Sequence, residues 1–223
     1  MSGEARRAWA GRVCTAADPL RVAVCISGTG SNMLALVEAF QSGRIPARCV
    51  LVLSDRADAP GLARAAARGV PTLWLDPAAH PTRTAYQQAL ATALVASGAE
   101  LVCLAGFMRL VKAPVLDAFP DRILNIHPAL LPAFPGLHAQ KQALDYGVKV
   151  AGCTVHLVTA GMDEGPIILQ AAVPVRDDDS EETLSARILA EEHRIYPGAV
   201  ALYAAGQLWL AGRRVQVRWE SQG

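Results

Sequence analysis

An amide and an imidazole stand two residues apart near the middle of the chain, as Asn125 and His127. The apolar run before them ends at Pro128, which is typical of a strand that stops at a loop. Because side chains alternate between the faces of a strand, Asn125 and His127 are predicted to share one face. An amide can donate to a developing oxyanion, and an imidazole can carry a proton near neutral pH. Both residues are therefore candidates for catalysis, and the alternative is that they only fix the following proline-rich loop.

A candidate third member, Asp163, lies in a turn-rich segment that covers residues 159–166. A carboxylate close to His127 would favour the imidazolium form, which is useful where a protonated histidine must meet a forming negative charge. An Asp-Glu pair before Gly-Pro is also typical of a plain surface turn. The sequence alone leaves the distance between Asp163 and His127 open.

A glycine turn, GTGSN at residues 28–32, follows the first apolar run and precedes a segment with helical spacing. Glycines let backbone N–H groups face a ligand, and a helix N-terminus favours a negative group, so the turn is a candidate phosphate site. Met33 stands where a dinucleotide fingerprint has its third glycine, and the P-loop ending is missing. The alternative is a tight turn with a Ser or Asn helix cap and no ligand.

The remaining histidines and the cysteines do not suggest a metal site. His156 alternates with apolar neighbours and is interpreted as a hydrogen-bonded core residue, whereas His138 opens a helix and could cap it or line a cleft. The five cysteines are widely spaced and form no CxxC pair, which favours a reducing compartment. Because neither residue type shows a zinc-like spacing, we expect no metal.

Alternating apolar and amphipathic segments must position these residues. Strand-like runs followed by helical segments fill residues 21–119, which predicts right-handed crossovers and a parallel sheet. Residues 150–158 and 167–175 are joined by a loop too short for a helix, which predicts an antiparallel pair. We therefore expect an α/β fold: a Rossmann-like open twisted mixed sheet, mostly parallel with an antiparallel C-terminal part, and helices on both faces.

The C-terminal part is expected to hold the longest helix and a hairpin. Ser180 is predicted to cap that helix, with acidic residues in its first turn. Pro197 and Gly198 are expected to interrupt it before Tyr203. A terminal hairpin is predicted around Gly212.

Length and composition agree with this fold. The chain has 223 residues, of which 52% are hydrophobic and 18% charged, which excludes disordered, collagenous and coiled-coil chains. The net charge of +1 gives no global attraction to nucleic acid or to a membrane surface, and no apolar run reaches the ~18 residues of a membrane span. We expect a cytoplasmic monomer or homodimer with a poorly ordered extension over residues 1–20 and one catalytic domain over residues 21–223.

Four motifs resemble those of the folate-dependent formyltransferases. The segment NIHPALLPAFPGLH at residues 125–138 is similar to the signature of that family. It is accompanied by the glycine turn at residues 28–32, by LAGFMR at residues 104–109 and by DEGPIILQ at residues 163–170. The motifs occur in family order at compatible spacings, and this specificity outweighs the purely structural alternatives.

The resemblance implies transfer of a formyl group from 10-formyltetrahydrofolate, a co-substrate, to the amine of 5-phosphoribosylglycinamide in de novo purine biosynthesis. It implies direct attack through a tetrahedral intermediate, without a metal, and small molecules as the only partners. The family roles fall on three catalytic residues, Asn125, His127 and Asp163, and on a substrate-binding set of Gly30, Ser31, Asn32, Leu189 and Glu192. Folate binding falls on Arg83, Met108, Arg109, Leu110, Val111, Asn125, Thr159, Ala160, Gly161, Met162 and Asp163.

The chain departs from the family pattern near these residues. Ala129 replaces a usual Ser, Gln140 a usual His, and Asp55 a usual Asn. Glu164 replaces a small residue, and it would add a second negative charge near His127 if it faced inward.

Three classes of alternative function remain to be separated: other formyl-folate enzymes, a reductase and a silent binding module. Methionyl-tRNA formyltransferases and formyltetrahydrofolate deformylases share the catalytic residues, but we expect the chain to be too short for their additional domains. A dinucleotide-dependent reductase would use residues 28–30 and Asp55, which leaves Asn125 and His127 unexplained. A catalytically silent nucleotide-binding module is the third alternative.

Overall fold

Seven strands form one sheet in the computed structural model, which describes residues 6–7 and 12–218. These strands are β2 (Leu20–Ile26), β3 (Ala47–Ser54), β4 (Thr72–Trp74), β5 (Leu101–Leu104), β6 (Ile123–His127), β7 (Val150–Leu157) and β8 (Ile167–Pro174). Their order across the sheet is β4-β3-β2-β5-β6-β7-β8. The pairs from β4 to β6 are parallel, and β7 is antiparallel to β6 and β8. The predicted mixed sheet is confirmed.

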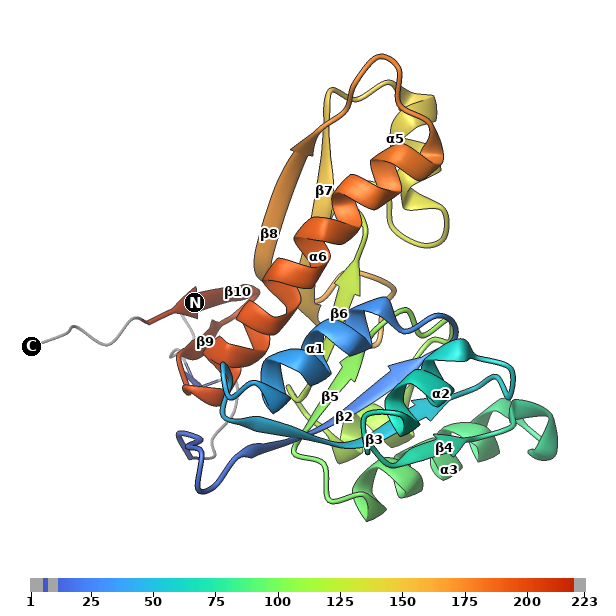
Figure 1. Ribbon diagram of the computed structural model, residues 1–223, viewed down its shortest axis with the longest axis vertical. Helices are drawn as coiled ribbons and strands as arrows, with labels where there is room; N and C mark the ends of the chain where they lie inside the picture. Colours follow the sequence, from blue (N-terminus) through green and yellow to red (C-terminus); the bar gives the residue numbers. More distant parts are fainter. Residues whose placement is uncertain (1–5, 8–11, 219–223) are drawn as a thin grey trace, which may run out of the picture.

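Helices cover both faces of this sheet, as predicted. They are α1 (Ser31–Gln41), α2 (Pro60–Ala66), the short 3-10 helix η1 (Pro77–Ala79), α3 (Arg83–Ala96), α4 (Ala113–Ala118), α5 (Ala139–Tyr146) and α6 (Glu181–Ala204). Successive side chains of β2 point to opposite faces of the sheet. Val22 and Val24 pack in one core cluster with α1 and α6, whereas Ala23 and Cys25 pack in another with α3 and α4. Figure 1 shows α1 and α6 side by side on the first face.

The longest helix, α6, begins as predicted and continues further than predicted. The Ser180 side chain accepts a hydrogen bond from the Thr183 N–H, and the Thr183 hydroxyl accepts one from the Ser180 N–H, which confirms the cap. The expected interruption at Pro197 and Gly198 is wrong, because the helix continues to Ala204. Proline removes one helical N–H bond. The residues around Pro197 are mostly buried, so packing against the sheet compensates for the lost bond.

A second, small sheet joins the two ends of the chain (Figure 1). It contains β1 (Arg6–Arg7), β9 (Leu208–Ala211) and β10 (Arg214–Val217), and the hairpin between the last two turns at Gly212, as predicted. Residues 1–5 and 8–11 of the expected extension lie outside the described residues. Within its described part, Cys14 is buried and its N–H donates to the Ala204 carbonyl. The division into an extension and one catalytic domain stays a prediction.

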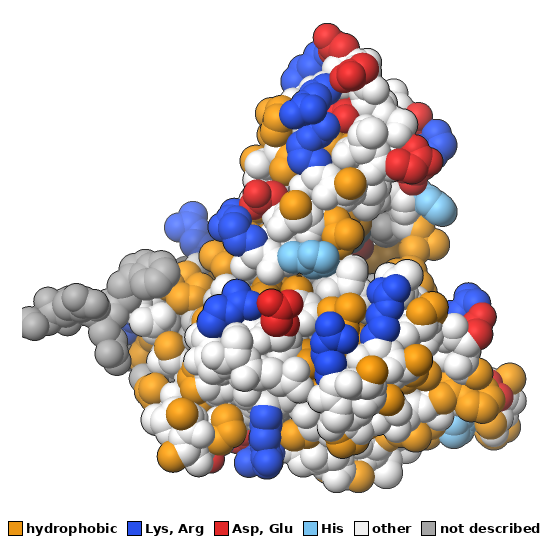
Figure 2. All heavy atoms as spheres, in the orientation of Figure 1, with side chains coloured by type: hydrophobic (Ala, Val, Ile, Leu, Met, Phe, Trp, Pro, Cys, Tyr) orange, Lys and Arg blue, Asp and Glu red, His pale blue; other side chains and the backbone are white. Residues whose placement is uncertain are grey.

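The connections locate the place where a ligand is expected. The chain runs from β2 outward to β3 and β4, and then returns to β5 on the other side of β2. This topological switch point lies between β2 and β5, and open α/β sheets bind ligands at the carboxyl ends of the strands there. The loops after β2, β5 and β6 all start from that edge. Figure 2 shows positive and negative side chains interspersed over the visible face, in keeping with the net charge of +1. Within the described residues, no helix is long and apolar enough to cross a membrane.

Candidate active site

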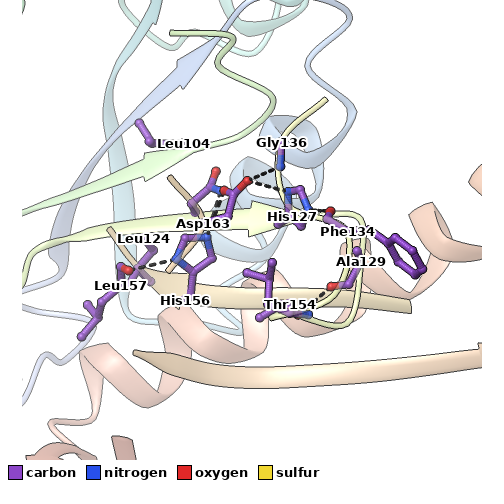
Figure 3. Close-up of polar contacts among 12 residues, drawn as sticks. Leu104, Leu124, His127, Ala129, Phe134, Gly136, Thr154, His156, Leu157 and Asp163 are labelled. Carbon is purple, nitrogen blue, oxygen red and sulfur yellow. Dashed lines mark hydrogen bonds and ion pairs between the residues drawn. The ribbon is translucent and has the colours of Figure 1, made fainter. Parts of the chain in front are cut away.

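Asn125 and His127 lie on one face of β6, and Asp163 from the β7–β8 loop contacts both. Figure 3 shows Asp163 beside His127. The Asn125 Nδ2 is 3.5 Å from the Asp163 Oδ1, and the His127 Nδ1 is 3.4 Å from the Asp163 Oδ2. The backbone N–H of Gly136 donates to the same Oδ2 at 2.8 Å and holds the carboxylate in place. The expected shared strand face is therefore present, and it brings together the three residues that the sequence singled out.

Both ring nitrogens of His127 face oxygen atoms. Nδ1 faces the Asp163 carboxylate at 3.4 Å, and Nε2 lies 2.9 Å from the carbonyl oxygen of Phe134. A neutral imidazole carries one N–H and can satisfy only one of these acceptors. An imidazolium could satisfy both, and the His127 side chain is buried, with 6% exposed. His127 is thus held between the Asp163 carboxylate and the Phe134 carbonyl.

His156 orients the Asn125 amide from the neighbouring strand. The two residues are paired directly across β6 and β7, and Asn125 Nδ2 lies 3.0 Å from His156 Nε2. The other nitrogen, Nδ1, lies 2.9 Å from the carbonyl of Leu157, so Nδ1 carries the hydrogen and Nε2 accepts from Asn125. Burial lowers the pKa of His156, which favours this neutral form. His156 is a hydrogen-bonded core residue, as predicted, but its contact with Asn125 depends on a register that the sequence does not reveal.

The loop after His127 is held by Thr154, which is fully buried on β7. Its hydroxyl donates to the Ala129 carbonyl at 2.7 Å and accepts from the Leu131 N–H at 3.1 Å. Gln170 on β8 donates both to Thr154 Oγ1 and to the Leu131 carbonyl, each at 3.0 Å. Sequence reasoning missed Thr154, because nothing distinguishes it from other strand threonines before the register is known.

Glu164, the residue after Asp163, lies against the backbone of its own loop. Its side chain lies against Gly161, and a Cβ added there would require the Glu164 carboxylate to shift. Among the described residues, its carboxylate forms no ion pair with His127. Glu164 therefore adds no second negative charge to the contacts of the His127 imidazole.

The glycine turn ends in a helix N-terminus that has no side-chain cap. Gly30 is the N-cap of α1, with φ 71°, and a Cβ there would meet the Gly61 Cα at 3.1 Å. Only glycine fits this conformation without strain. The Ser or Asn cap of the alternative reading is not found, so the first N–H groups of α1, beginning at Ser31, lack an intrahelical partner and are available to an anion.

Asn32 and Glu192 form a buried polar pair behind this turn. The Asn32 Nδ2 donates to the Glu192 Oε2 at 2.6 Å. Burial raises the pKa of Glu192, and the hydrogen bond from Asn32 acts in the opposite direction. The Asn32 Oδ1 is buried and has no hydrogen-bond partner within the described part of the chain. Leu189 is half-buried one helical turn before Glu192. The pair thus presents polar groups that a hydroxylated ligand could satisfy.

A cavity of about 660 Å³ lies beside the segment that follows β5. Met108, Arg109 and Leu110 line it, together with Arg83 and Lys112, and no acidic residue is among its lining residues. The Lys112 Nζ lies 3.5 Å from the Ala160 carbonyl and joins this segment to residues 159–162. Four of the predicted folate residues, Arg83, Met108, Arg109 and Leu110, line this cavity. Val111 is buried, and neither Asn125 nor residues 159–163 are among the lining residues.

Neither a metal ligand set nor a thiolate nucleophile is found in the described ranges 6–7 and 12–218. No group of three His, Cys, Asp or Glu residues there could hold a metal ion. Burial raises the pKa of Cys25, Cys49 and Cys153 to about 12, so these cysteines remain thiols at neutral pH. The site is therefore built from an amide, an imidazole and a carboxylate.

Known proteins with a similar sequence or fold include phosphoribosylglycinamide formyltransferases. The formyl transferase family model matches residues 20–200. A phosphoribosylglycinamide formyltransferase of Escherichia coli is 41% identical over 203 residues, which cover 88% of this chain and 96% of that protein. The trifunctional purine biosynthetic protein adenosine-3 of Drosophila pseudoobscura is 48% identical over 190 residues, and the match covers 84% of this chain but only 14% of that protein. The crystal structure of glycinamide ribonucleotide transformylase 1 from Symbiobacterium toebii has a TM-score of 0.88 and 63% identity, over 89% of this chain and 94% of that chain.

Proposed function

The chain belongs to the formyl transferase family, and we propose that it transfers the formyl group of 10-formyltetrahydrofolate to the amine of 5-phosphoribosylglycinamide. The family match and relatives that carry the name phosphoribosylglycinamide formyltransferase support this reaction, which belongs to purine biosynthesis. The observation that carries the proposal is the meeting of Asn125, His127 and Asp163 at the carboxyl edge of the sheet. The uncapped N-terminus of α1 and a cavity lined by cationic side chains also support it.

The two substrates would approach these residues from opposite sides. The phosphate would bind the N-terminus of α1 at Gly30, Ser31 and Asn32, and Glu192 would accept hydrogen bonds from the ribose hydroxyls beside Leu189. The folate would lie along Met108, Arg109, Leu110 and Val111 and against Thr159, Ala160, Gly161 and Met162, with its anionic tail toward Arg83.

Formyl transfer then needs two charges to be handled. The neutral amine attacks the formyl carbon, so the carbonyl oxygen becomes an oxyanion and the amine nitrogen becomes cationic. Asn125 donates to the oxyanion through Nδ2, whose orientation His156 fixes. His127, as an imidazolium, would place a positive charge close to the oxyanion.

The proton released by the amine must reach N10 of the folate as the bond from N10 to the formyl carbon breaks. Asp163 faces the His127 Nδ1 and could hold a water molecule that carries this proton. The products are the formylated amide and tetrahydrofolate, so no covalent intermediate with the protein is needed. Small molecules as the only partners and a cytoplasmic location belong to the same proposal.

The acceptor decides between this function and its alternatives. Purified protein is incubated with 10-formyltetrahydrofolate and one of three acceptors: 5-phosphoribosylglycinamide, methionyl-tRNA or water. We expect tetrahydrofolate to be released together with formylated phosphoribosylglycinamide, and far more slowly with the other two. Formylation of tRNA alone, or hydrolysis alone, would contradict the proposal, and binding of NADH without formyl transfer would favour a reductase.

A further inference from the structure

One buried carboxylate, Asp55, lies directly after β3 and between the two proposed substrate sites. Asp55 as a whole is 8% exposed. Asp55 Oδ1 accepts a hydrogen bond from the Ser27 hydroxyl at 2.6 Å, and Oδ2 forms an ion pair with the Arg109 Nε at 2.7 Å. Both carboxylate oxygens therefore have a partner: one contacts Ser27 and the other contacts Arg109.

Ser27 connects Asp55 both to the glycine turn after β2 and to the segment after β5. It stands directly before the glycine turn, and its backbone N–H donates to the Gly106 carbonyl at 3.0 Å. Its hydroxyl donates to Asp55 and accepts from the Met108 N–H at 2.9 Å. The loop after β2 and the loop after β5 are thus joined by the Ser27 hydroxyl and the Asp55 carboxylate.

The far end of the segment after β5 is fixed separately by Gln87. Its amide donates to the Leu110 carbonyl at 3.0 Å and accepts from the Lys112 N–H at 2.8 Å. The segment from Met108 to Lys112 is consequently held at both ends. Asp55 and Ser27 set the end that lies closest to the glycine turn.

We propose that Asp55 is a positioning residue that fixes the folate segment against the phosphate turn and so couples the binding of the two substrates. This inference rests on the proposed function. The Asp55 side chain is 6% exposed and that of Arg109 is 44% exposed, so the ion pair is less screened than a pair on the open surface. An asparagine at this position could accept from Ser27 but would give Arg109 no charge.

Asp55→Asn tests the ionic contact, and Asp58→Asn is the matched control. Asp58 lies on the same loop and pairs with Arg56 at 3.0 Å, but its side chain is 72% exposed. We expect Asp55→Asn to raise the KM for 10-formyltetrahydrofolate and the Kd for tetrahydrofolate about fivefold to tenfold, the scale of coupling between side chains in contact. Turnover at saturation should stay within about twofold, because the catalytic residues do not touch Asp55. Asp58→Asn should leave all three quantities unchanged.

Ser27→Ala tests the coupling itself. In the wild type, saturating 5-phosphoribosylglycinamide should tighten the binding of tetrahydrofolate, measured by calorimetric titration. This tightening should shrink in both Ser27→Ala and Asp55→Asn. Arg109→Gln removes the same ion pair from its more exposed side, and adding Asp55→Asn to that variant should then weaken binding little further.

The readouts separate this inference from the proposed function. A wild type that binds tetrahydrofolate in an Asp55-dependent way but does not formylate 5-phosphoribosylglycinamide would overturn the function and leave the positioning role standing. An active wild type whose KM, Kd and coupling are unchanged by Asp55→Asn would overturn the positioning role alone. A fall in turnover with unchanged KM would also overturn it, and a wild type that does not bind tetrahydrofolate would overturn both.

Discussion

Replacing Asp163 by asparagine removes one charge beside His127 while keeping nearly the same shape. The amide oxygen can still accept from the Gly136 N–H, which now donates to the carboxylate at 2.8 Å. What disappears is the attraction between the carboxylate and an imidazolium whose Nδ1 lies 3.4 Å away. At an effective dielectric constant of about 20, two unit charges at that distance attract by about 5 kcal/mol. The Asp163 side chain is 14% exposed, so solvent screening reduces this. We take about half, roughly 2.5 kcal/mol, which corresponds to nearly a hundredfold in rate.

The assay is steady-state turnover of 10-formyltetrahydrofolate with saturating 5-phosphoribosylglycinamide. We expect kcat of Asp163→Asn to fall about a hundredfold with little change in either KM, because the lost charge acts on the transition state. Glu164→Gln is the control: it makes the same charge change one residue away, on a side chain that lies against Gly161. It should stay within about twofold of the wild type. Wild-type turnover in Asp163→Asn, or an equal loss in Glu164→Gln, would refute the electrostatic reasoning.

Two further substitutions test the surroundings of the site. Thr154→Val should lower stability by about 1–3 kcal/mol in chemical denaturation and slow turnover about tenfold, because it leaves buried loop groups without their partner; unchanged stability would mean that the hydroxyl does not hold the loop. Burial raises the pKa of Glu192, so the stability from this group is present below its unfolded pKa and is lost as pH rises through the folded value. Glu192→Gln should therefore raise Tm relative to the wild type by about 2 °C more at pH 8 than at pH 5. An equal Tm difference at both pH values would show that ionisation of Glu192 does not cost stability.

Local sequence patterns were enough for much of the fold and for two of the three central residues. Strand alternation and Pro128 predict that Asn125 and His127 share a face, and this needs no knowledge of the rest of the chain. The short loop before β8 predicts the antiparallel pair for the same reason. The prediction at Pro197 failed because it used local propensity alone, whereas packing of the buried helix residues decides the outcome.

The remaining features depend on contacts between distant parts of the chain. The pairing of Asn125 with His156 follows from the register of β6 and β7, which the sequence does not fix. The ion pair between Asp55 and Arg109 joins loops 54 residues apart, after strands that are not neighbours in the sheet. The direction of the Glu164 side chain depends on the close approach of Gly161. Each of these required the assembled structure.

The most direct test of the proposed chemistry is single-turnover formyl transfer by the wild type and by His127→Ala. We expect the wild type to convert 5-phosphoribosylglycinamide and 10-formyltetrahydrofolate into the formylated product and tetrahydrofolate. His127→Ala should bind both substrates but transfer the formyl group about a hundredfold more slowly, or slower still, since it loses the charged donor to the oxyanion. Transfer at the wild-type rate in this variant would contradict the central role given to His127.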